Sequence, residues 1–508
     1  MKGLWVFVIV NILAISKGRK NVLFIVMDDL RPQLGAYNGP YFPGSGQSLM
    51  HTPNIDGLAS KSLLLKRAYV QQALCSPSRA SFMTGRRPDT THVYDLYTYF
   101  RSVGGNFTTI PQYFKSKGYE TAGMGKIYHP GVASNNNDPL SWSMPYLRGD
   151  HNWEDKNHSW KGIPDSLLKD RPLIDKQIAD HAINTLQHLA PAAKSGHKPF
   201  FLAVGFYRPH LPFVFPQSFI HNYPWSDVHV PDNQFAPRSM PTIAWTHSNE
   251  LWSYQDIKDT KFTGDINTTL PHATVIKLRR AYYTSVSWVD SLIGNVLAEL
   301  SRLGLDSNTV VSFVGDHGWK LGEHGAWAKH TNFNVDTHAP MMVKVPGMTD
   351  NGIVSEKLTE FVDLFPTLVE AAGVSPVPLC PENSATVSVC HEGQSLIPLI
   401  KNPNIAWKNA SFSQYPRRHS HHDIMGYTIT TERYRYTEWV RFNKPTYKPD
   451  WNTVVDAELY DHQVDPHENI NKVHYHSQSN IKMQLSQQLR AGWRDTLPSS
   501  AISHGFGR

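Results

Sequence analysis

The chain has 508 residues, of which 49 are Lys or Arg and 43 are Asp or Glu, so its formal net charge is +6 with histidine neutral. With 40% hydrophobic and 18% charged residues, the composition allows a large core and excludes a disordered or collagen-like chain. Three cysteines in this length exclude a disulfide-dense scaffold. Because no run of five or more basic residues occurs, we predict no nucleic-acid partner.

The first segment has the pattern of a secretory signal. Lys2 precedes an apolar stretch from Leu4 to Ile15, and small residues around Ser16 suit a signal peptidase. The stretch is shorter than a bilayer requires, so we predict a signal peptide over residues 1–16 and no stable membrane insertion. The alternative is a buried first strand or helix. Four Asn-x-Ser/Thr triplets agree with export and are predicted glycosylation sites: Asn106, Asn157, Asn267 and Asn409.

Apolar runs of strand length then alternate with helical patterns. This alternation predicts an α/β fold with a large, mainly parallel sheet that is covered by helices on both faces. In chain order, the predicted elements are strand 22–27, helix 53–62, helix 110–117, strand 121–125, helix 175–190, strand 200–206, helix 274–303, strand 309–314, strand 341–345 and helix 361–372.

The pattern changes after a segment rich in Pro, Ser and Asn, residues 374–409, which we interpret as a linker or a loop-bearing boundary. Residues 425–430 and 434–440 alternate across a turn and predict antiparallel strands, and residues 481–493 predict a terminal amphipathic helix. We therefore predict an N-terminal domain over residues 17–400 and a smaller C-terminal α+β domain with an antiparallel sheet over residues 401–508.

The cysteines fall into two groups. Cys380 and Cys390 have nine residues between them in a Pro-flanked loop, and in an exported chain we predict that they form a disulfide. Cys75 is then left over. An odd thiol in such a chain is either buried and inert or chemically special.

Polar residues follow four of the predicted strands. The carboxyl ends of parallel strands form the ligand-binding edge of an open α/β sheet, so we expect these side chains to meet there. They are Asp28, Asp29, Lys126, His129, His210, Asp316 and His317.

Three of these residues, Asp28, Asp29 and Asp316, would repel one another unless a cation joined them. Carboxylate oxygens suit calcium or magnesium, whereas the imidazole of His317 is more typical of a zinc site. The alternative is structural: Asp28 caps a turn and Asp29 pairs with Arg31.

Cys75 opens a further cluster. Pro77 suits the first turn of a helix, which would place Cys75 at a helix N-terminus where backbone N–H groups favour an anion. A reactive thiolate and a buried structural cysteine are both open interpretations.

Cys75-x-Pro77-Ser78-Arg79, followed by Thr84-Gly85, resembles the signature of the type I sulfatases. The resemblance covers nearly all of the chain after the signal and is strongest to the branch that acts on iduronate. Further matching stretches are residues 28–32, 84–91, 106–114, 316–319, 321–325, 413–417, 424–427 and 458–461.

This resemblance implies an alkaline-phosphatase-like fold and the hydrolysis of sulfate esters. It implies that a formylglycine-generating enzyme converts Cys75 to formylglycine during secretion. It also implies a bound Ca²⁺, with Mg²⁺ as the alternative, and the following ligands: Asp28, Asp29, residue 75, Asp316 and His317.

The resemblance further assigns roles around residue 75. Arg79 and Lys126 hold the hydrated aldehyde, and His129 is the base. Lys329 and His210 bind the sulfate, and His210 is also the acid for the leaving oxygen. Trp319 lines the sugar pocket.

The implied substrate is the 2-O-sulfate of terminal iduronate in heparan sulfate and dermatan sulfate, so the implied partner is a sulfated glycosaminoglycan oligosaccharide. The implied location is lysosomal or secreted. Asp423 stands where the iduronate branch has a lysine suited to a sugar carboxylate, which keeps another sulfated sugar as an alternative. A third hypothesis is an inactive module that binds sulfated glycans through the same basic cleft.

Overall fold

The computed structural model describes residues 18–39, 50–419 and 421–498, so the predicted signal peptide lies outside the described residues. Among the described helices, none combines the length and the apolar character that crossing a membrane requires.

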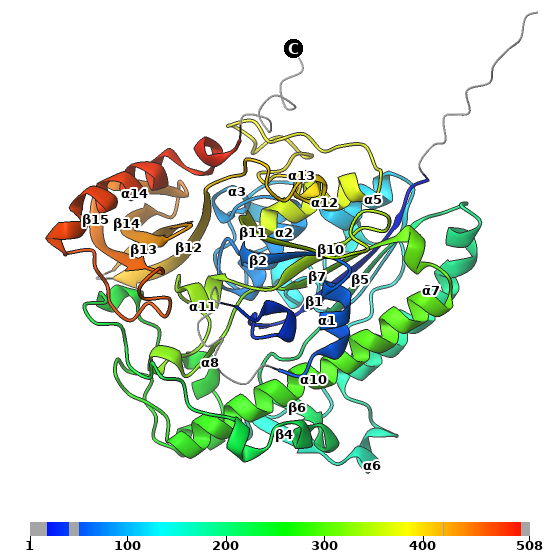
Figure 1. The fold of residues 1–508 in the computed structure, drawn as a ribbon, viewed down its shortest axis with the longest axis horizontal. Coiled ribbons are helices and arrows are strands. Elements are labelled where there is room, and N and C mark those ends of the chain that lie inside the picture. The colour runs from blue at the N-terminus through cyan, green and yellow to red at the C-terminus, as the bar shows by residue number, and fades with distance from the viewer. Residues whose placement is uncertain (1–17, 40–49, 420, 499–508) are drawn as a thin grey trace, which may run out of the picture.

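The central feature is a seven-stranded sheet with the strand order β11-β2-β10-β7-β1-β5-β3 (Figure 1). Six of these strands run parallel to one another, and β10 alone is antiparallel to its neighbours β2 and β7. This arrangement confirms the predicted fold class. The strands are β1 (Asn21–Met27), β2 (Leu63–Tyr69), β3 (Glu120–Gly125), β5 (Phe200–Phe206), β7 (Thr309–Gly315), β10 (Met341–Lys344) and β11 (Ile353–Glu360).

Helices cover both faces of this sheet. Successive residues of a strand point to opposite faces. In β1, Leu23 and Ile25 accordingly join one hydrophobic core, and Val22 and Phe24 join the other. The first core contains α1 (Pro53–Ala59), α7 (Ile174–Lys194) and α10 (His272–Arg302). The second contains α2 (Cys75–Thr84), α5 (Ile110–Ser116), α12 (Leu364–Ala371) and α13 (Ile397–Lys401).

A second, antiparallel sheet forms the C-terminal part, as predicted. Its strands are β12 (Ala410–His419), β13 (His422–Thr431), β14 (Tyr434–Asn443) and β15 (Lys448–Asp461), in that order. Helix α14 (Ser479–Ala491) packs Leu485 and Leu489 against the sheet residues Ile429 and Leu459. The predicted domain boundary after residue 400 falls inside α13 and stays a prediction.

The segment 374–409 packs against helices that cover the seven-stranded sheet and is not a free linker. Leu396 and Leu399 are completely buried in the second core, and Cys380 and Cys390 form a disulfide within the segment. The predicted sequon residues Asn106, Asn157, Asn267 and Asn409 are all exposed. Their glycosylation stays a prediction.

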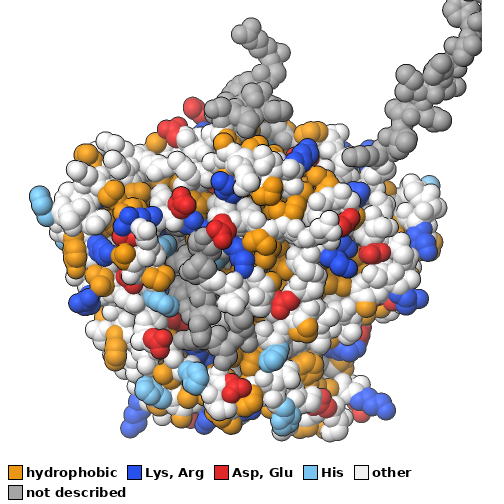
Figure 2. Space-filling view, viewed as in Figure 1, with side chains coloured by type: hydrophobic (Ala, Val, Ile, Leu, Met, Phe, Trp, Pro, Cys, Tyr) orange, Lys and Arg blue, Asp and Glu red, His pale blue; other side chains and the backbone are white. Residues whose placement is uncertain are grey.

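Short elements complete the chain. They are α3 (Pro88–Thr91), α4 (Phe100–Val103), β4 (Trp160–Ile163), α6 (Asp165–Leu168), β6 (Phe213–Pro216), α8 (Asn249–Trp252), α9 (Gln255–Lys258), β8 (Lys320–Leu321), β9 (Trp327–Ala328) and α11 (Asn334–Thr337). On the face shown in Figure 2, acidic, basic and histidine side chains are interspersed, so the positive net charge is not gathered in one patch there.

Candidate active site

The neighbouring strands β1 and β7 bring two polar pairs together at their carboxyl ends. Asp28 and Asp29 follow β1, and Asp316 and His317 follow β7, the strand that pairs with β1 in parallel. The backbone N–H of Asp29 donates a hydrogen bond of 2.8 Å to Oδ1 of Asp316. All four side chains are completely buried. The strand ends therefore meet at one edge of the sheet.

The backbone at Asp29 is held in an unusual conformation. Its φ of 62° lies in the left-handed region, which a non-glycine residue occupies only when its surroundings impose it. The hydroxyl of Tyr282, on α10, donates to the Asp29 carbonyl at 2.7 Å and accepts from the N–H of Arg31 at 3.0 Å. The guanidinium of Arg31 pairs with Glu323 at 2.8 Å. The alternative that Asp29 pairs with Arg31 is therefore wrong.

Cys75 is the first residue of α2 and is 1% exposed. Its Sγ atom lies 3.6 Å from Oδ1 of Asp28, 4.0 Å from Oδ1 of Asp29 and 3.5 Å from Nε2 of His317. Burial, together with the charge of Asp28, raises the pKa of the thiol to about 12. The unmodified residue is thus a thiol at neutral pH, which argues against the reactive-thiolate interpretation.

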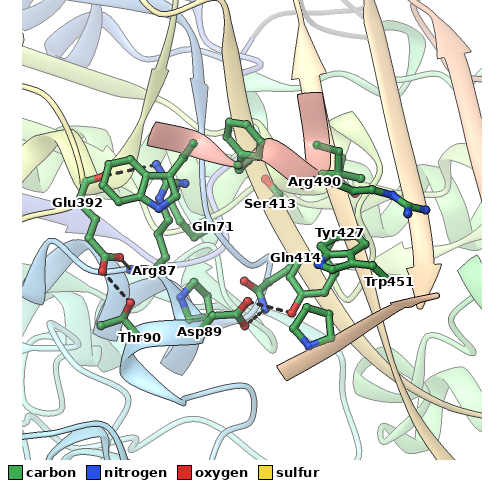
Figure 3. Close-up of a pocket in the computed structure, with 17 residues that line it drawn as sticks. Gln71, Arg87, Asp89, Thr90, Glu392, Ser413, Gln414, Tyr427, Trp451 and Arg490 are labelled. Atoms are coloured by element: carbon green, nitrogen blue, oxygen red, sulfur yellow. Dashed lines mark hydrogen bonds between the residues drawn. The ribbon is translucent and has the colours of Figure 1, made fainter. Parts of the chain in front are cut away.

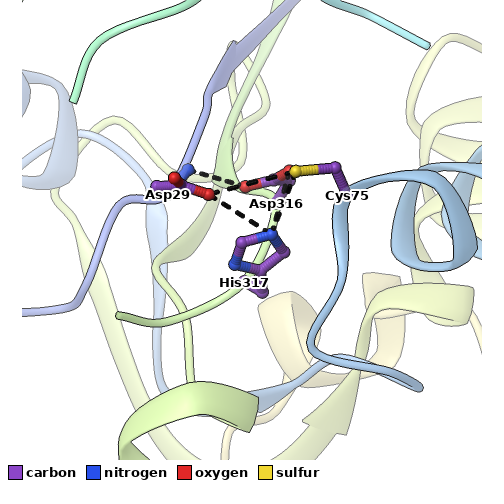
Figure 4. A group of neighbouring side chains, drawn as sticks. All are labelled: Asp29, Cys75, Asp316 and His317. Atoms are coloured by element: carbon purple, nitrogen blue, oxygen red, sulfur yellow. Dashed lines mark hydrogen bonds and ion pairs between the residues drawn. The ribbon is translucent and has the colours of Figure 1, made fainter. Parts of the chain in front are cut away.

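Asp29, Cys75, Asp316 and His317 form a compact group of potential metal ligands (Figure 4). Their ligand atoms all lie within 4.8 Å of one another, and Asp28 forms a second such group with Cys75 and His210. Burial raises the pKa of Asp29 well above its usual value, although Lys329 opposes this effect. Buried carboxylate oxygens that converge on one place fit a hard divalent cation such as Ca²⁺.

Arg79 and Lys126 form ion pairs with the acidic cluster of Asp28, Asp29 and Asp316. Arg79, one turn along α2 from Cys75, donates to Oδ1 of Asp28 at 2.8 Å and to Oδ2 of Asp316 at 3.0 Å. Lys126 also pairs with Asp28 and lies 3.6 Å from the Cys75 sulfur. Burial alone would raise the pKa of Asp28, but Lys126 and Arg79 hold it well below its usual value. Asp28 therefore remains ionised.

Lys126 and His129 follow β3, which approaches β5 closely at its end. Gly125 has a φ of 69°, and a Cβ atom there would lie 1.9 Å from the carbonyl oxygen of Gly205, so only glycine fits. The Nδ1 atom of His129 is buried and has no hydrogen-bond partner among the described residues. Burial, followed by the charge of Lys126, lowers the pKa of His129 to about 3. The ring is therefore neutral near neutral pH and is a weaker base than a free imidazole.

Lys329 and His210 lie on the other side of Asp29. The Nζ atom of Lys329 is 2.9 and 3.1 Å from the two carboxylate oxygens of Asp29, and Nε2 of His210 is 4.0 Å from Oδ2. Trp319 is 1% exposed, and its ring lies 4.8 Å beneath the Lys329 ammonium. Trp319 is therefore buried under Lys329, and its predicted role in lining a sugar pocket stays a prediction.

Glu250 was not among the predicted site residues, and the structure places it beside Lys329 and His210. Its carboxylate contacts Lys329 at 2.9 Å, His210 at 3.1 Å and His330 at 3.2 Å. Glu250 belongs to the short helix α8 in a region without a clear helical or strand periodicity. No motif or spacing in the sequence marks it.

A separate cavity of about 270 Å³ lies between α14, the C-terminal sheet and the loop after α2 (Figure 3). Arg87, Asp89, Tyr427, Trp451 and other side chains line it. Asp89 accepts hydrogen bonds from Gln414 at 2.7 Å and from Tyr427 at 2.8 Å. The lining contains none of the residues predicted for the site at Cys75.

Comparisons with known proteins match nearly the whole chain to one family. The family model named Sulfatase matches residues 20–374, and the model for the C-terminal part of N-sulphoglucosamine sulphohydrolase matches residues 322–494. The chain is 38% identical to iduronate 2-sulfatase of Mus musculus over 513 residues, which covers 88% of this chain and 89% of that protein. The Homo sapiens protein of the same name is 38% identical over 511 residues, which covers 88% of this chain and 90% of the relative.

Solved structures share the fold at lower identity. A structure described as a 2-O GAG sulfatase superposes with a TM-score of 0.67 and 21% identity, covering 93% of this chain and 92% of that one. A phosphonate monoester hydrolase of Agrobacterium radiobacter gives a TM-score of 0.67 and 20% identity, covering 93% and 96%. Because this fold carries more than one hydrolytic activity, the likeness shows the fold alone.

Proposed function

The chain belongs to the sulfatase family and is a sulfuric ester hydrolase, and we propose that it removes the 2-O-sulfate of terminal iduronate in heparan sulfate and dermatan sulfate. The observation that carries the proposal is the placement of Cys75 within 4.8 Å of Asp29, Asp316 and His317 at the edge of the sheet. The iduronate specificity is supported by the names of the two mammalian relatives.

The residues present fit a calcium ion, because three buried carboxylates and one imidazole converge beside Cys75. Asp28, Asp29, Asp316 and His317 would hold it. When bound, the ion neutralises the charge of a sulfate group and lowers the pKa of an adjacent hydroxyl.

Conversion of Cys75 to formylglycine by a formylglycine-generating enzyme is the second part of the proposal. Its hydrate would supply a hydroxyl nucleophile at a position where the thiol itself is held protonated. The sulfur lies 3.6 Å from Nζ of Lys126. Arg79 lies one helical turn further along α2, and we propose that it and Lys126 hold the oxygen atoms on residue 75.

His129 and His210 are the proposed proton-transfer residues of the reaction. His129 is the proposed base that takes a proton from residue 75, the role that the family resemblance gives it. His210 is the candidate acid, because its Nε2 lies near Asp29 and its side chain is 27% exposed toward solvent. Burial, followed by the charge of Lys126, lowers the pKa of His210. A lowered pKa favours the neutral ring, so the proton-donating form of His210 requires a more acidic pH than that of a free imidazole.

Lys329 is the proposed sulfate-binding cation on the opposite side of the cluster. Its ammonium is buried and lies between Asp29 and Glu250, with Trp319 beneath it. With Asp29 serving as a metal ligand, the Lys329 ammonium would keep donors for sulfate oxygens.

One observation favours a second candidate, a sulfatase for a different sulfated sugar. Asp423 is exposed and lies opposite Arg418 across the β12–β13 pair. Arg417 is not a free clamp for a sugar carboxylate, because it donates to the backbone carbonyls of Ile243 at 3.1 Å, Pro416 at 3.2 Å and His330 at 2.5 Å. A sugar without a carboxylate would not require a cation at this place.

A panel of defined sulfated disaccharides separates the candidates, with released sulfate measured at pH 5 and pH 7. We expect release from substrates with a non-reducing terminal 2-O-sulfated iduronate. Release only from 6-O-sulfated or N-sulfated glucosamine would replace the first candidate by the second. Binding of the same disaccharides without release of sulfate from any of them would support the inactive glycan-binding module.

A further inference from the structure

We propose that Glu250 is a positioning residue for this hydrolysis, which holds Lys329 and His210 in the orientation that sulfate binding and proton donation require. The inference rests on the proposed function. It assigns a role to a carboxylate that is not a member of the Asp29–Cys75–Asp316–His317 group.

One carboxylate oxygen of Glu250 serves both partners. Oε1 lies 2.9 Å from Nζ of Lys329 and 3.1 Å from Nε2 of His210. The proposed sulfate ligand and the proposed acid are therefore tied to the same atom. A shift of this oxygen would displace both groups together.

Each partner is also fixed at a second point. Nζ of Lys329 lies 2.9 Å from Asp29, equal to its distance from Glu250, and sits over the Trp319 ring. The Nδ1 atom of His210 lies 2.6 Å from the carbonyl oxygen of Leu211. Glu250 thus completes the orientation of an ammonium and an imidazole that are already anchored on their other sides.

The second oxygen of Glu250 is held from the C-terminal sheet. Oε2 lies 3.2 Å from Nε2 of His330, and Nδ1 of His330 lies 2.8 Å from the hydroxyl of Tyr415 on β12. Arg417, two residues further along β12, donates to the His330 carbonyl at 2.5 Å. The chain of contacts from Tyr415 through His330 to Glu250 therefore connects the C-terminal sheet to the proposed sulfate site.

The effect of removing the charge of Glu250 on sulfate binding distinguishes a positioning role from a purely electrostatic one. A carboxylate beside an anion-binding site repels the anion, so removing its charge should strengthen sulfate binding if charge were its only contribution. If Glu250 orients Lys329, removing the charge should weaken sulfate binding, because the ammonium loses its fixed position. The two roles predict effects of opposite sign.

The test compares wild type with Glu250→Gln, which keeps the shape and removes the charge, and with Tyr415→Phe, which releases His330 but leaves Glu250 in place. Glu299→Gln is the matched control, because Glu299 lies near the C-terminal end of α10 and accepts hydrogen bonds from Gln187 and Arg302, which belong to neither the proposed site nor its contacts. Each protein is loaded with calcium and checked for equal aldehyde content at residue 75 and for its unfolding temperature. Binding of inorganic sulfate and kcat and KM for the preferred disaccharide are then measured.

For Glu250→Gln we expect kcat to fall by about 100-fold and sulfate binding to weaken by about tenfold. Tyr415→Phe should change both quantities in the same direction by less, and Glu299→Gln should change neither. Tighter sulfate binding by Glu250→Gln with an unchanged kcat would overturn the inference. If Glu250→Gln does not fold, the decision falls to Tyr415→Phe. A kcat and a sulfate affinity equal to those of the wild type in that variant would overturn the inference. A wild-type protein without turnover contradicts the proposed function, and the sign of the change in sulfate binding still decides the role of Glu250.

Discussion

The Sγ atom of Cys75 lies 3.5 Å from Nε2 of His317, although 242 residues separate them in the sequence. This contact joins the start of α2 to the end of β7. It brings a residue that resembles a formylglycine precursor next to a group of carboxylates that can bind a cation. The following predictions depend on this juxtaposition.

Metal removal tests the acidic cluster. We expect chelation to abolish sulfate release and added calcium to restore it. At a calcium concentration 100 times the dissociation constant, binding to the folded state alone stabilises a protein by about 2.7 kcal/mol, so the unfolding temperature should rise as well. Asp316→Asn should lose both responses, whereas Asp180→Asn, at an exposed position on α7, should keep them. Full activity after exhaustive chelation would contradict the metal site.

Arg79 balances two buried carboxylates. Removing its side chain in Arg79→Ala leaves Asp28 and Asp316 without this partner in a fully buried site. Breaking a buried ion pair of this kind costs about 3–5 kcal/mol of the free energy of unfolding, measured by denaturant titration of the calcium-free protein. Arg433→Ala, which removes a more exposed pair with Asp461, should have a much smaller effect. Equal effects of the two substitutions would show that Arg79 does not stabilise the cluster.

The disulfide should matter for stability and not for turnover. Cys380 and Cys390 are 10 residues apart in the sequence, and a bridge that closes a loop of this size stabilises by about 2–3 kcal/mol. We expect the double variant Cys380→Ser/Cys390→Ser to lose this amount in denaturant titration and to keep its kcat. A large loss of kcat in the fully folded double variant would show that the loop closed by this disulfide affects the active site.

Acid should destabilise the fold in part through His338. Burial lowers the pKa of this residue to about 3, below its unfolded value of about 6.5. The unfolded state therefore binds a proton first, and the stability contributed by neutral His338 is lost as the pH falls below about 6.5. This loss amounts to about 2 kcal/mol between pH 7 and pH 5. His338→Phe, which keeps the ring beside Tyr69, should reduce the measured difference in unfolding free energy by that amount. If His338→Phe has the same difference in unfolding free energy between pH 7 and pH 5 as the wild type, the lowered pKa of His338 is contradicted.

The strand ends were predictable because polar residues directly follow strongly apolar runs. Asp28 after β1 and Asp316 after β7 are examples, and the parallel order of the strands fixes their meeting at one edge. The orientation of β10 was not predictable, because an apolar run carries no information about its direction. Strands β2 and β11 were both missed. The residues of β11 alternate polar and apolar too weakly to give a strand pattern, and the apolar run of β2 is interrupted by Lys66 and Arg67.

Only part of the site was predicted, because some of its contacts depend on tertiary packing that leaves no pattern in the sequence. Glu250 reaches Lys329 through the packing of a short helix against the segment after β9, and such packing leaves no period in the sequence. The burial of Trp319 beneath Lys329 likewise depends on tertiary contacts and not on neighbouring residues.

The most direct test of the account is the rate of sulfate release from a disaccharide with a terminal 2-O-sulfated iduronate. The rate is measured for the protein made together with a formylglycine-generating enzyme and for its Cys75→Ala variant. Cys75 is buried among Asp28, Asp29 and His317, so we expect the wild type to release sulfate and the folded variant to release none above background. Equal rates for the two proteins would show that residue 75 does not carry the chemistry.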